Sequence, residues 1–167
     1  MLTPPITSRD HITGNPGGKT EIVEYGDFQC PYCGEAFQVI RELLQSSAGL
    51  VKFVFRNFPL AEAHEYATDA AIAAEAAGRQ QKFWEMHDAL YQNQQRLNDD
   101  LFLVLAKELQ LDIDQFLSDM EDNQLQSKVE ADFESGVRSG VNGTPTFFIN
   151  GKRYNGDYRN LLSVLRH

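Results

Sequence analysis

The chain's only two cysteines, Cys30 and Cys33, stand three residues apart at the junction of two sequence patterns. Residues 20–26 before them are rich in β-forming side chains, and residues 36–44 after them repeat apolar side chains at helical spacing. The pair therefore lies where a strand passes into a helix. A fold that accommodates this pattern holds the two thiols at or near a helix N-terminus, where proteins keep reactive dithiols.

This position predicts different properties for the two thiols. Free peptide N–H groups and the helix dipole favour an anion at a helix N-terminus, so Cys30 is expected to ionise more readily than a free cysteine. Pro31 has no N–H group and a φ suited to the first helical turn. Residues i and i+3 share a helix face, so Cys33 can reach Cys30 and is the expected resolving thiol.

Two other interpretations of the cysteine pair explain less. A structural disulfide that closes a loop of about four residues stabilises a fold by only roughly 2 kcal/mol. A zinc site needs about four ligands, but the sequence has no second cysteine pair. Its four histidines are dispersed: His11, His64, His87 and His167. We therefore interpret the pair as a redox-active dithiol.

The composition predicts one globular domain and excludes some partners. The chain has 167 residues, of which 42% are hydrophobic, and this is enough for a sizeable core. Its net charge of −9 argues against nucleic acid or an anionic membrane as the main partner. Nine acidic side chains and one basic side chain lie between Glu108 and Glu134, and we expect them on solvated helix faces.

The sequence also carries a prediction about location. No apolar run is long enough to span a bilayer, and the first residues lack the apolar segment of a secretory leader. As written, the chain is predicted to be cytoplasmic and not to insert into a membrane. A periplasmic or other extracytoplasmic location is the alternative if a leader has been removed.

The predicted elements divide the chain into three parts. Residues 1–19 are rich in Pro, Gly, Ser and Thr and are expected to form an N-terminal arm of loop. Residues 20–60 and 141–167 are expected to form a discontinuous α/β domain, with helices around a mixed sheet. Residues 61–140 carry apolar side chains at helical spacing throughout and predict an inserted helical subdomain.

Smaller features refine this division. Residues 51–58 alternate as a strand, and Asn150-Gly151 is a preferred hairpin turn between two further strands. A final helix is expected over residues 157–165. Trp84 and His87 lie within a predicted helix and are interpreted as packing residues.

Three features together resemble one family. The Cys-Pro-Tyr-Cys motif follows a strand, Thr144-Pro145 precedes a second sheet segment, and a helical insertion separates the two motifs. From about Thr20 onward the chain is similar to the DsbA family of thiol:disulfide oxidoreductases, which implies a thioredoxin-like fold with an inserted all-α subdomain. In that family the proline is cis and lies against the cysteines. The resemblance therefore implies that Thr144 and Pro145 contact substrate.

The resemblance also draws attention to Glu24, which stands six residues before Cys30, at the position of a buried acid in that family. It implies a catalytic role for this side chain. A carboxylate on a central parallel strand is costly to bury and titrates abnormally, so Glu24 can exchange a proton with Cys33. A strand-edge glutamate that points into solvent is the alternative.

The dipeptide between the cysteines differs from that of the best-known periplasmic members, which have Pro-His. Pro31 and Tyr32 stand here, and both are expected to tune the site, Tyr32 through access and stacking. The missing histidine removes a possible positive neighbour of Cys30. The difference predicts a less oxidising site.

The sequence therefore predicts an enzyme that exchanges a Cys30–Cys33 dithiol or disulfide with protein or peptide thiols through a mixed disulfide. Either direction of electron flow remains open, and a separate redox partner is expected. No metal and no cofactor beyond the Cys30–Cys33 disulfide are predicted. Two other functions remain open: a glutathione-dependent transferase or isomerase on the same fold, and a non-catalytic peptide- or zinc-binding module.

Overall fold

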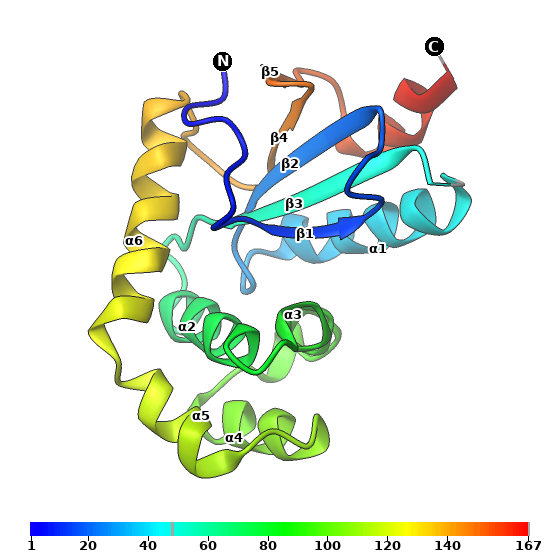
Figure 1. Cartoon of the computed structure of the whole chain (residues 1–167). Coiled ribbons are helices and arrows are strands. Elements are labelled where there is room, and N and C mark those ends of the chain that lie inside the picture. Colours follow the sequence, from blue (N-terminus) through cyan, green and yellow to red (C-terminus); the bar gives the residue numbers. More distant parts are fainter. Residues whose placement is uncertain (48, 167) are drawn as a thin grey trace.

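A mixed β-sheet forms the centre of the molecule (Figure 1). The computed structural model describes residues 1–47 and 49–166, the side chain of Arg166 excepted. The described residues form a five-stranded sheet in the order β1-β3-β2-β4-β5. Strands β2 and β3 are parallel, and every other neighbouring pair is antiparallel. The strands are β1 (His11–Gly14), β2 (Thr20–Gly26), β3 (Val51–Asn57), β4 (Thr146–Ile149) and β5 (Lys152–Arg153).

Helices surround this sheet, so the predicted α/β class is confirmed. Helix α1 connects the parallel strands β2 and β3, while α2 to α6 form the block below and beside the sheet (Figure 1). The α-helices are α1 (Pro31–Ser46), α2 (Ala67–Gly78), α3 (Phe83–Gln92), α4 (Asp99–Glu108), α5 (Ile113–Met120) and α6 (Asn123–Arg138). Two further segments are 3₁₀-helices, η1 (Gln94–Arg96) and η2 (Tyr158–Arg166).

Local sequence signals set the starts of three of these helices. The side chain of Asn98 accepts a hydrogen bond from the Leu101 N–H at the start of α4. Asp112 and Asp122 cap α5 and α6 in the same way. Such caps replace hydrogen bonds that the first turn of a helix cannot make internally. The helical content predicted for residues 61–140 follows from these caps together with the apolar spacing.

The two faces of the sheet have different cores. Successive strand residues point to opposite faces, so Ile22 and Glu24 on β2 point to one side, and Val23 and Tyr25 to the other. The first face contributes to a core that runs from α1 through α2 and α3 to α6. The second face packs against the N-terminal arm, and partly buried Phe133 of α6 joins that smaller core. The inserted helices thus share a core with the sheet, and their independence as a subdomain stays a prediction.

Two expected elements take a different form. The arm predicted as loop over residues 1–19 contains β1, whose residues His11–Gly14 pair with the edge of β3. A four-residue strand is too short to show a periodic pattern, and its partner lies about forty residues away in the chain. The final helix is of the 3₁₀ type.

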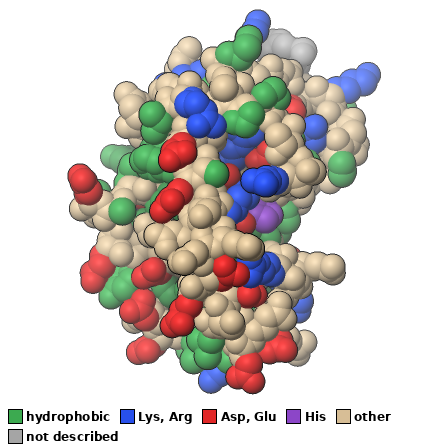
Figure 2. Space-filling view, turned by 60° about the vertical axis from the view of Figure 1, so that its left-hand side comes forward, with side chains coloured by type: hydrophobic (Ala, Val, Ile, Leu, Met, Phe, Trp, Pro, Cys, Tyr) green, Lys and Arg blue, Asp and Glu red, His purple; other side chains and the backbone are tan. Residues whose placement is uncertain are grey.

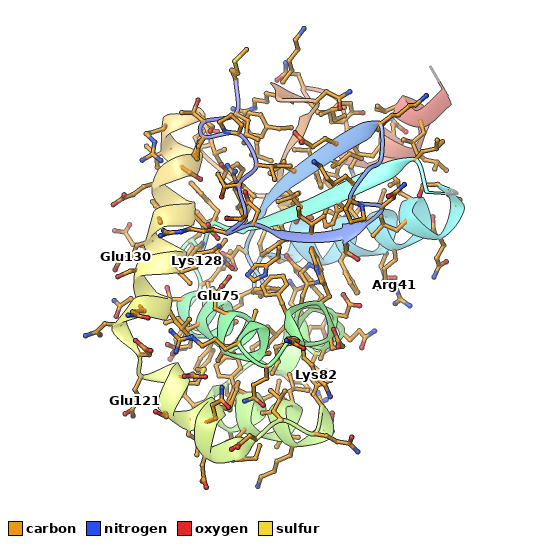
Figure 3. The ribbon with its side chains drawn as sticks, in the orientation of Figure 1. Arg41, Glu75, Lys82, Glu121, Lys128 and Glu130 are labelled. Atoms are coloured by element: carbon orange, nitrogen blue, oxygen red, sulfur yellow. The ribbon has the colours of Figure 1, made fainter. Side chains whose placement is uncertain are left out.

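Part of the acidic run is buried, which corrects the expectation of solvated faces. Asp132 of α6 is 7% exposed and bonds to Lys128 and to Asn57. We call Glu75, His11, Asn57, Lys128 and Asp132 the Glu75 cluster. Figure 3 shows Glu75 of α2 and Lys128 of α6 pointing toward one another, whereas Glu130 points away from the molecule. The cluster ties the inserted helices to β1 and β3.

Other acidic side chains are on the surface. On the face shown in Figure 2 they gather mainly over the lower half, where α4, α5 and the first part of α6 lie. Within the part of the chain that the structure describes, no helix is both long and apolar enough to cross a membrane.

Candidate active site

The local sequence places Cys30 at the N-terminus of α1. Cys30 is the N-cap residue, in an extended conformation with φ −72° and ψ 122°, and Pro31 begins the first turn. Upstream, the Cys30 N–H donates to the Asp27 carbonyl at 3.1 Å, which closes the turn between β2 and α1. Cys30 therefore meets the free N–H groups of the helix, as the sequence predicts.

The surroundings of Cys30 favour its thiolate. A hydrogen bond from the Cys33 thiol is the largest of the effects that lower the pKa of Cys30, to about 5. Burial opposes this change, while the side chain of Thr144 and the N–H groups of Cys33 and Tyr32 add to it. In its thiol form, Cys30 donates to the Thr144 carbonyl oxygen at 3.6 Å.

Cys33 is held in the opposite state. Its side chain is fully buried one helical turn into α1, and burial is the main reason why its pKa lies well above the ordinary value for a thiol. The hydrogen bond to Cys30 and the negative charge of Glu24 raise this pKa further. The Asp27 N–H donates to Cys33 Sγ at 3.5 Å. Both cysteines are free thiols in this structure, with one sulfur poised for ionisation and the other kept protonated.

Glu24 lies in the middle of the sheet, on the face that packs against α1. It pairs with Phe55 of β3 and Phe147 of β4 and is only 2% exposed, so the strand-edge alternative is wrong. Among the described residues, its Oε2 atom has no hydrogen-bond partner. Burial, and then the charge of Cys30, raise the pKa of Glu24 to about 8. This carboxyl group can hold and release a proton near neutral pH.

The remaining predicted residues lie beside Cys30, in the first turn of α1 or in the loop before β4. The Thr144–Pro145 peptide bond is cis, and it leads into β4 beside the dithiol. Tyr32 is 63% exposed and covers no core position. The structure thus brings together one end of α1, the loop before β4 and the middle of β2.

Sequence reasoning missed two residues of this region. The buried Asp27 carboxylate accepts hydrogen bonds from the N–H groups of Gln29 and Leu60, and from His64 Nδ1. The bond from Gln29 could have been expected from sequence, because an Asp side chain in a turn commonly accepts from the N–H group two residues later. Gln94 of η1 donates to the Cys30 and Phe28 carbonyls at 2.7 and 2.9 Å. No local pattern marks Gln94.

Among residues 1–47 and 49–166, no group of three or more His, Cys, Asp or Glu side chains is placed to hold a metal ion. At the two sulfur atoms, the polar neighbours among the described residues are the other cysteine, Thr144 and the N–H groups of Tyr32, Cys33 and Asp27.

Comparison with curated sequences yields longer relatives. The Na⁺/H⁺ antiporter NhaA 1 of Salinispora arenicola is 43% identical over 158 residues, which make up 95% of this chain but 24% of that protein. The Na⁺/H⁺ antiporter NhaA of Herminiimonas arsenicoxydans is 35% identical over 168 residues, 99% of this chain and 27% of that protein. The chain thus spans about a quarter of the length of the curated relatives it matches.

These relatives overturn the prediction of a cytoplasmic location. That prediction rested on the absence of a leader from the first residues. Because the relatives extend far beyond the region they share with this chain, its first residue carries no information about a leader, and no location follows from it.

Solved structures share the fold over nearly the whole chain. A thioredoxin-like oxidoreductase from Silicibacter pomeroyi matches with a TM-score of 0.82 and 28% identity, over 96% of this chain and 91% of that one. BdbD from Bacillus subtilis matches with a TM-score of 0.84 and 22% identity, over 97% and 94% of the two chains. The thiol-disulfide exchange protein α-DsbA2 from Wolbachia pipientis matches with a TM-score of 0.81 and 22% identity, over 94% and 86%.

The resemblance to DsbA-type proteins and the thioredoxin-like fold are thereby confirmed. The sequence model of a thioredoxin family, Thioredoxin_4, matches residues 7–165, and the chain belongs to that family.

Proposed function

We propose that this protein is a thiol:disulfide oxidoreductase that acts on protein or peptide thiols through the Cys30–Cys33 pair. One observation carries the proposal: a thiol with a pKa of about 5 at the N-terminus of α1 is next to a second, buried thiol. A thiolate is the nucleophile in disulfide exchange, and a resolving thiol beside it completes the reaction. The names of the structural neighbours agree with this chemistry.

In the oxidising direction, a substrate thiolate attacks Cys30 Sγ and the Cys30–Cys33 bond breaks. Cys33 leaves with the electron pair and takes a proton, while a substrate–Cys30 mixed disulfide forms. A second substrate thiolate then attacks the substrate sulfur of the mixed disulfide and displaces the Cys30 thiolate. The substrate loses two electrons to the enzyme, and the disulfide of a redox partner accepts them to restore the enzyme.

In the reducing direction the same steps run backwards. The Cys30 thiolate attacks a substrate disulfide, and Cys33 resolves the mixed disulfide as it loses its proton. A low pKa at Cys30 stabilises the reduced enzyme and its leaving group, which supports transfer of a disulfide to substrates. We therefore propose the oxidising direction as the main one.

The other residues have supporting roles in this proposal. Glu24 exchanges the proton of Cys33, because its carboxyl group is buried on the same face and titrates near pH 8. Pro31 starts the helix that presents Cys30, and exposed Tyr32 offers a ring to an incoming peptide. Thr144 and Pro145 form the backbone edge beside Cys30 that a substrate chain would contact. The disulfide itself is the redox group, and no further cofactor is proposed.

Mixed-disulfide trapping tests the proposal. The Cys33→Ser variant should form a covalent complex with a thiol-containing peptide activated as a mixed disulfide, because the resolving thiol is gone. The Cys30→Ser variant is the matched control. Its remaining thiol, that of Cys33, is buried, so this variant should form no covalent complex. Absence of a complex with Cys33→Ser would contradict the proposal and favour a binding module.

A second measurement addresses direction and the remaining alternative. The reduction potential of the Cys30–Cys33 pair against glutathione should lie above about −200 mV for a disulfide donor, and a value near −270 mV would assign a reductase. A glutathione-dependent transferase needs one nucleophile only, so it would retain turnover in Cys33→Ser. We expect turnover to be lost in that variant.

A further inference from the structure

Beneath the dithiol, a set of aromatic rings packs on the face of the sheet that carries Glu24. We call Phe28, Phe37, Phe55, His87 and Tyr91 the aromatic box. Tyr91 of α3 lies 5.0 Å from Phe28 and 5.2 Å from Phe37, ring centre to ring centre, and His87 lies 5.1 Å from Tyr91. Phe55 pairs with Glu24 in the sheet and lies 5.0 Å from His87. Glu24 and Cys33 therefore share one apolar compartment with Tyr91.

Three buried polar atoms of this compartment have no hydrogen-bond partner among the described residues: Glu24 Oε2, the Tyr91 hydroxyl and His87 Nε2. Each of them costs free energy, because burial removes water without replacing its hydrogen bonds. Three such atoms around one set of rings are hard to explain by packing alone, since phenylalanine would fill the space of Tyr91 without this cost.

The chemistry of the three atoms differs. His87 Nδ1 donates to Asp88 at 2.8 Å, so in the neutral ring Nε2 carries a lone pair and can only accept. Burial lowers the pKa of His87 and keeps the ring neutral. Burial also raises the pKa of Tyr91 well above its usual range, so its hydroxyl remains a donor. Of the three unpartnered atoms, only the Tyr91 hydroxyl is therefore a hydrogen-bond donor while Glu24 is ionised.

The Glu24 carboxyl group packs closely against Gly26 and Phe55 on this face. A Cβ atom on Gly26 would lie 2.6 Å from Glu24 Oε2 and 2.5 Å from a ring carbon of Phe55. Glycine at this position thus leaves the carboxyl group room beside Phe55. The neutral acid needs no strong partner, but the carboxylate that forms when Glu24 gives up its proton does.

We propose that Tyr91 is a positioning residue for Glu24, whose hydroxyl donates to the Glu24 carboxylate while the proton is on Cys33. When Cys33 leaves as a thiolate, Glu24 gives it a proton and Tyr91 O–H turns to the carboxylate. When Glu24 regains a proton, the hydroxyl is released toward His87 Nε2. No electrons move in this step. The inference rests on the proposed function and adds the group that stabilises its intermediate charge.

The titratable groups that face Glu24 come from three elements. Cys33 belongs to α1 and Cys30 is the N-cap residue of that helix, Asp27 lies in the loop after β2, and His87 and Tyr91 belong to α3. On the neighbouring strands β3 and β4, Glu24 is paired with phenylalanine side chains. A titration of Glu24 in the oxidised protein removes both cysteines from this set, since a disulfide does not titrate.

The test is a ¹³C NMR titration of the Glu24 carboxyl group in the oxidised protein, assigned with Glu24→Gln. Tyr91→Phe should raise the pKa of Glu24 by about one pH unit, the usual effect of one hydrogen bond to a charged group. Glu75 provides an internal control, because its pKa should stay unchanged. An unchanged or lower pKa of Glu24 in Tyr91→Phe overturns the proposal.

Site-specific 3-fluorotyrosine at position 91 should shift the pKa of Glu24 in the direction opposite to Tyr91→Phe. It keeps the hydroxyl and the ring but makes the phenol a stronger donor, so the pKa of Glu24 should fall, and a rise or no change would contradict the proposal. If Tyr91 only filled space, Tyr91→Phe would keep or raise the melting temperature of the protein and would not move the titration of Glu24. Neither titration needs turnover. The trapping experiment can therefore contradict the proposed function while the titrations support the role of Tyr91, and the titrations can contradict that role while trapping succeeds.

Discussion

Glu24 and Glu75 are both buried carboxyl groups, 2% and 5% exposed, but their surroundings differ completely. Glu75 accepts hydrogen bonds from His11 Nε2 at 2.9 and 3.0 Å and from Asn57 Nδ2 at 2.9 Å, with Lys128 Nζ 3.8 Å away. Among the described residues, Glu24 Oε2 has no such partner. One acid is built into a polar network, and the other is left in an apolar compartment.

The difference shows that burial alone does not decide the state of an acid. Burial would raise the pKa of Glu75, but the bond from His11 and the charge of Lys128 outweigh it, and its pKa is lowered. For Glu24 burial prevails, and the pKa rises to about 8. The partnered acid stays charged and joins α2 to β1, β3 and α6. The unpartnered acid costs stability and can exchange a proton, a compromise common at reactive sites.

The largest effect is expected for Glu75→Ala, which breaks the Glu75 cluster at its centre. His11 loses its carboxylate, and Lys128 loses one of its two acidic neighbours. Removing one partner of a buried ion pair costs about 3–5 kcal/mol. We expect a loss of that size in urea unfolding near pH 7, with disulfide exchange intact below the midpoint. Glu108→Ala, which changes an exposed glutamate, is the control. If Glu75→Ala lost no more unfolding free energy than this control, the stabilising role of the partnered acid would be contradicted.

Glu24→Gln is expected to act with the opposite sign and to depend on pH. The folded state holds the Glu24 proton up to about pH 8, whereas the unfolded chain releases it near 4.5, the ordinary pKa of a glutamate. The folded state thus binds more protons in this window, and the wild type loses stability as pH rises through it, by about 1.4 kcal/mol per pH unit. Near pH 7 the glutamine variant should therefore be more stable by about 3 kcal/mol.

The measurement is the difference in unfolding free energy between wild type and Glu24→Gln from pH 5 to pH 8, in the same redox state. For Glu75 the sign is reversed: its lowered pKa gives stability that is present above the unfolded pKa and is lost on acidification. Parallel curves for wild type and Glu24→Gln would show that Glu24 is already ionised at pH 5.

The dithiol side of this comparison could be predicted from sequence, because its signals are local. The cysteine spacing, Pro31 at the helix start and the hairpin at Asn150-Gly151 each depend on a few adjacent residues. The resemblance drew attention to Glu24. The resemblance supplied the link between Cys30 and the distant Pro145. The functional roles of these residues stay predictions.

The Glu75 side could not be predicted, because each of its members has an ordinary sequence context. Asp132 is one acid among nine in its region, and only the approach of β3 to α6 buries it. His11 stands in a stretch that looks like loop until its edge pairing with β3 is known. Likewise the packing of His87 was expected, but its unpartnered Nε2 atom appears only once Asp88 fixes the ring.

Cys33→Ala tests the same comparison within the dithiol. The charge of Cys30 is stabilised by hydrogen bonds, as that of Glu75 is, whereas burial keeps Cys33 neutral, as it does Glu24. The Cys33 thiol is the largest cause of the low pKa of Cys30. Without that hydrogen bond the pKa of Cys30 should rise by about one to two pH units. Thiolate absorbance during a pH titration measures it. Tyr32→Phe is the control, because it keeps the peptide N–H of residue 32 and should leave the pKa of Cys30 unchanged. If the pKa of Cys30 were also unchanged in Cys33→Ala, the helix N-terminus and not the Cys33 thiol would be the cause of the low pKa.

The smallest effect is expected for His64→Ala, which tests whether a partnered acid beside the dithiol behaves as Glu75 does. The Asp27 carboxylate is fully buried and accepts from two peptide N–H groups besides His64. His64 itself is partly exposed, so water can replace its bond, and we expect a loss of about 1 kcal/mol in urea unfolding. The pKa of Cys30 should not change. A loss of unfolding free energy as large as that of Glu75→Ala would contradict this expectation. It would mean that the hydrogen bond from His64 alone stabilises the Asp27 carboxylate as strongly as the whole Glu75 cluster stabilises Glu75.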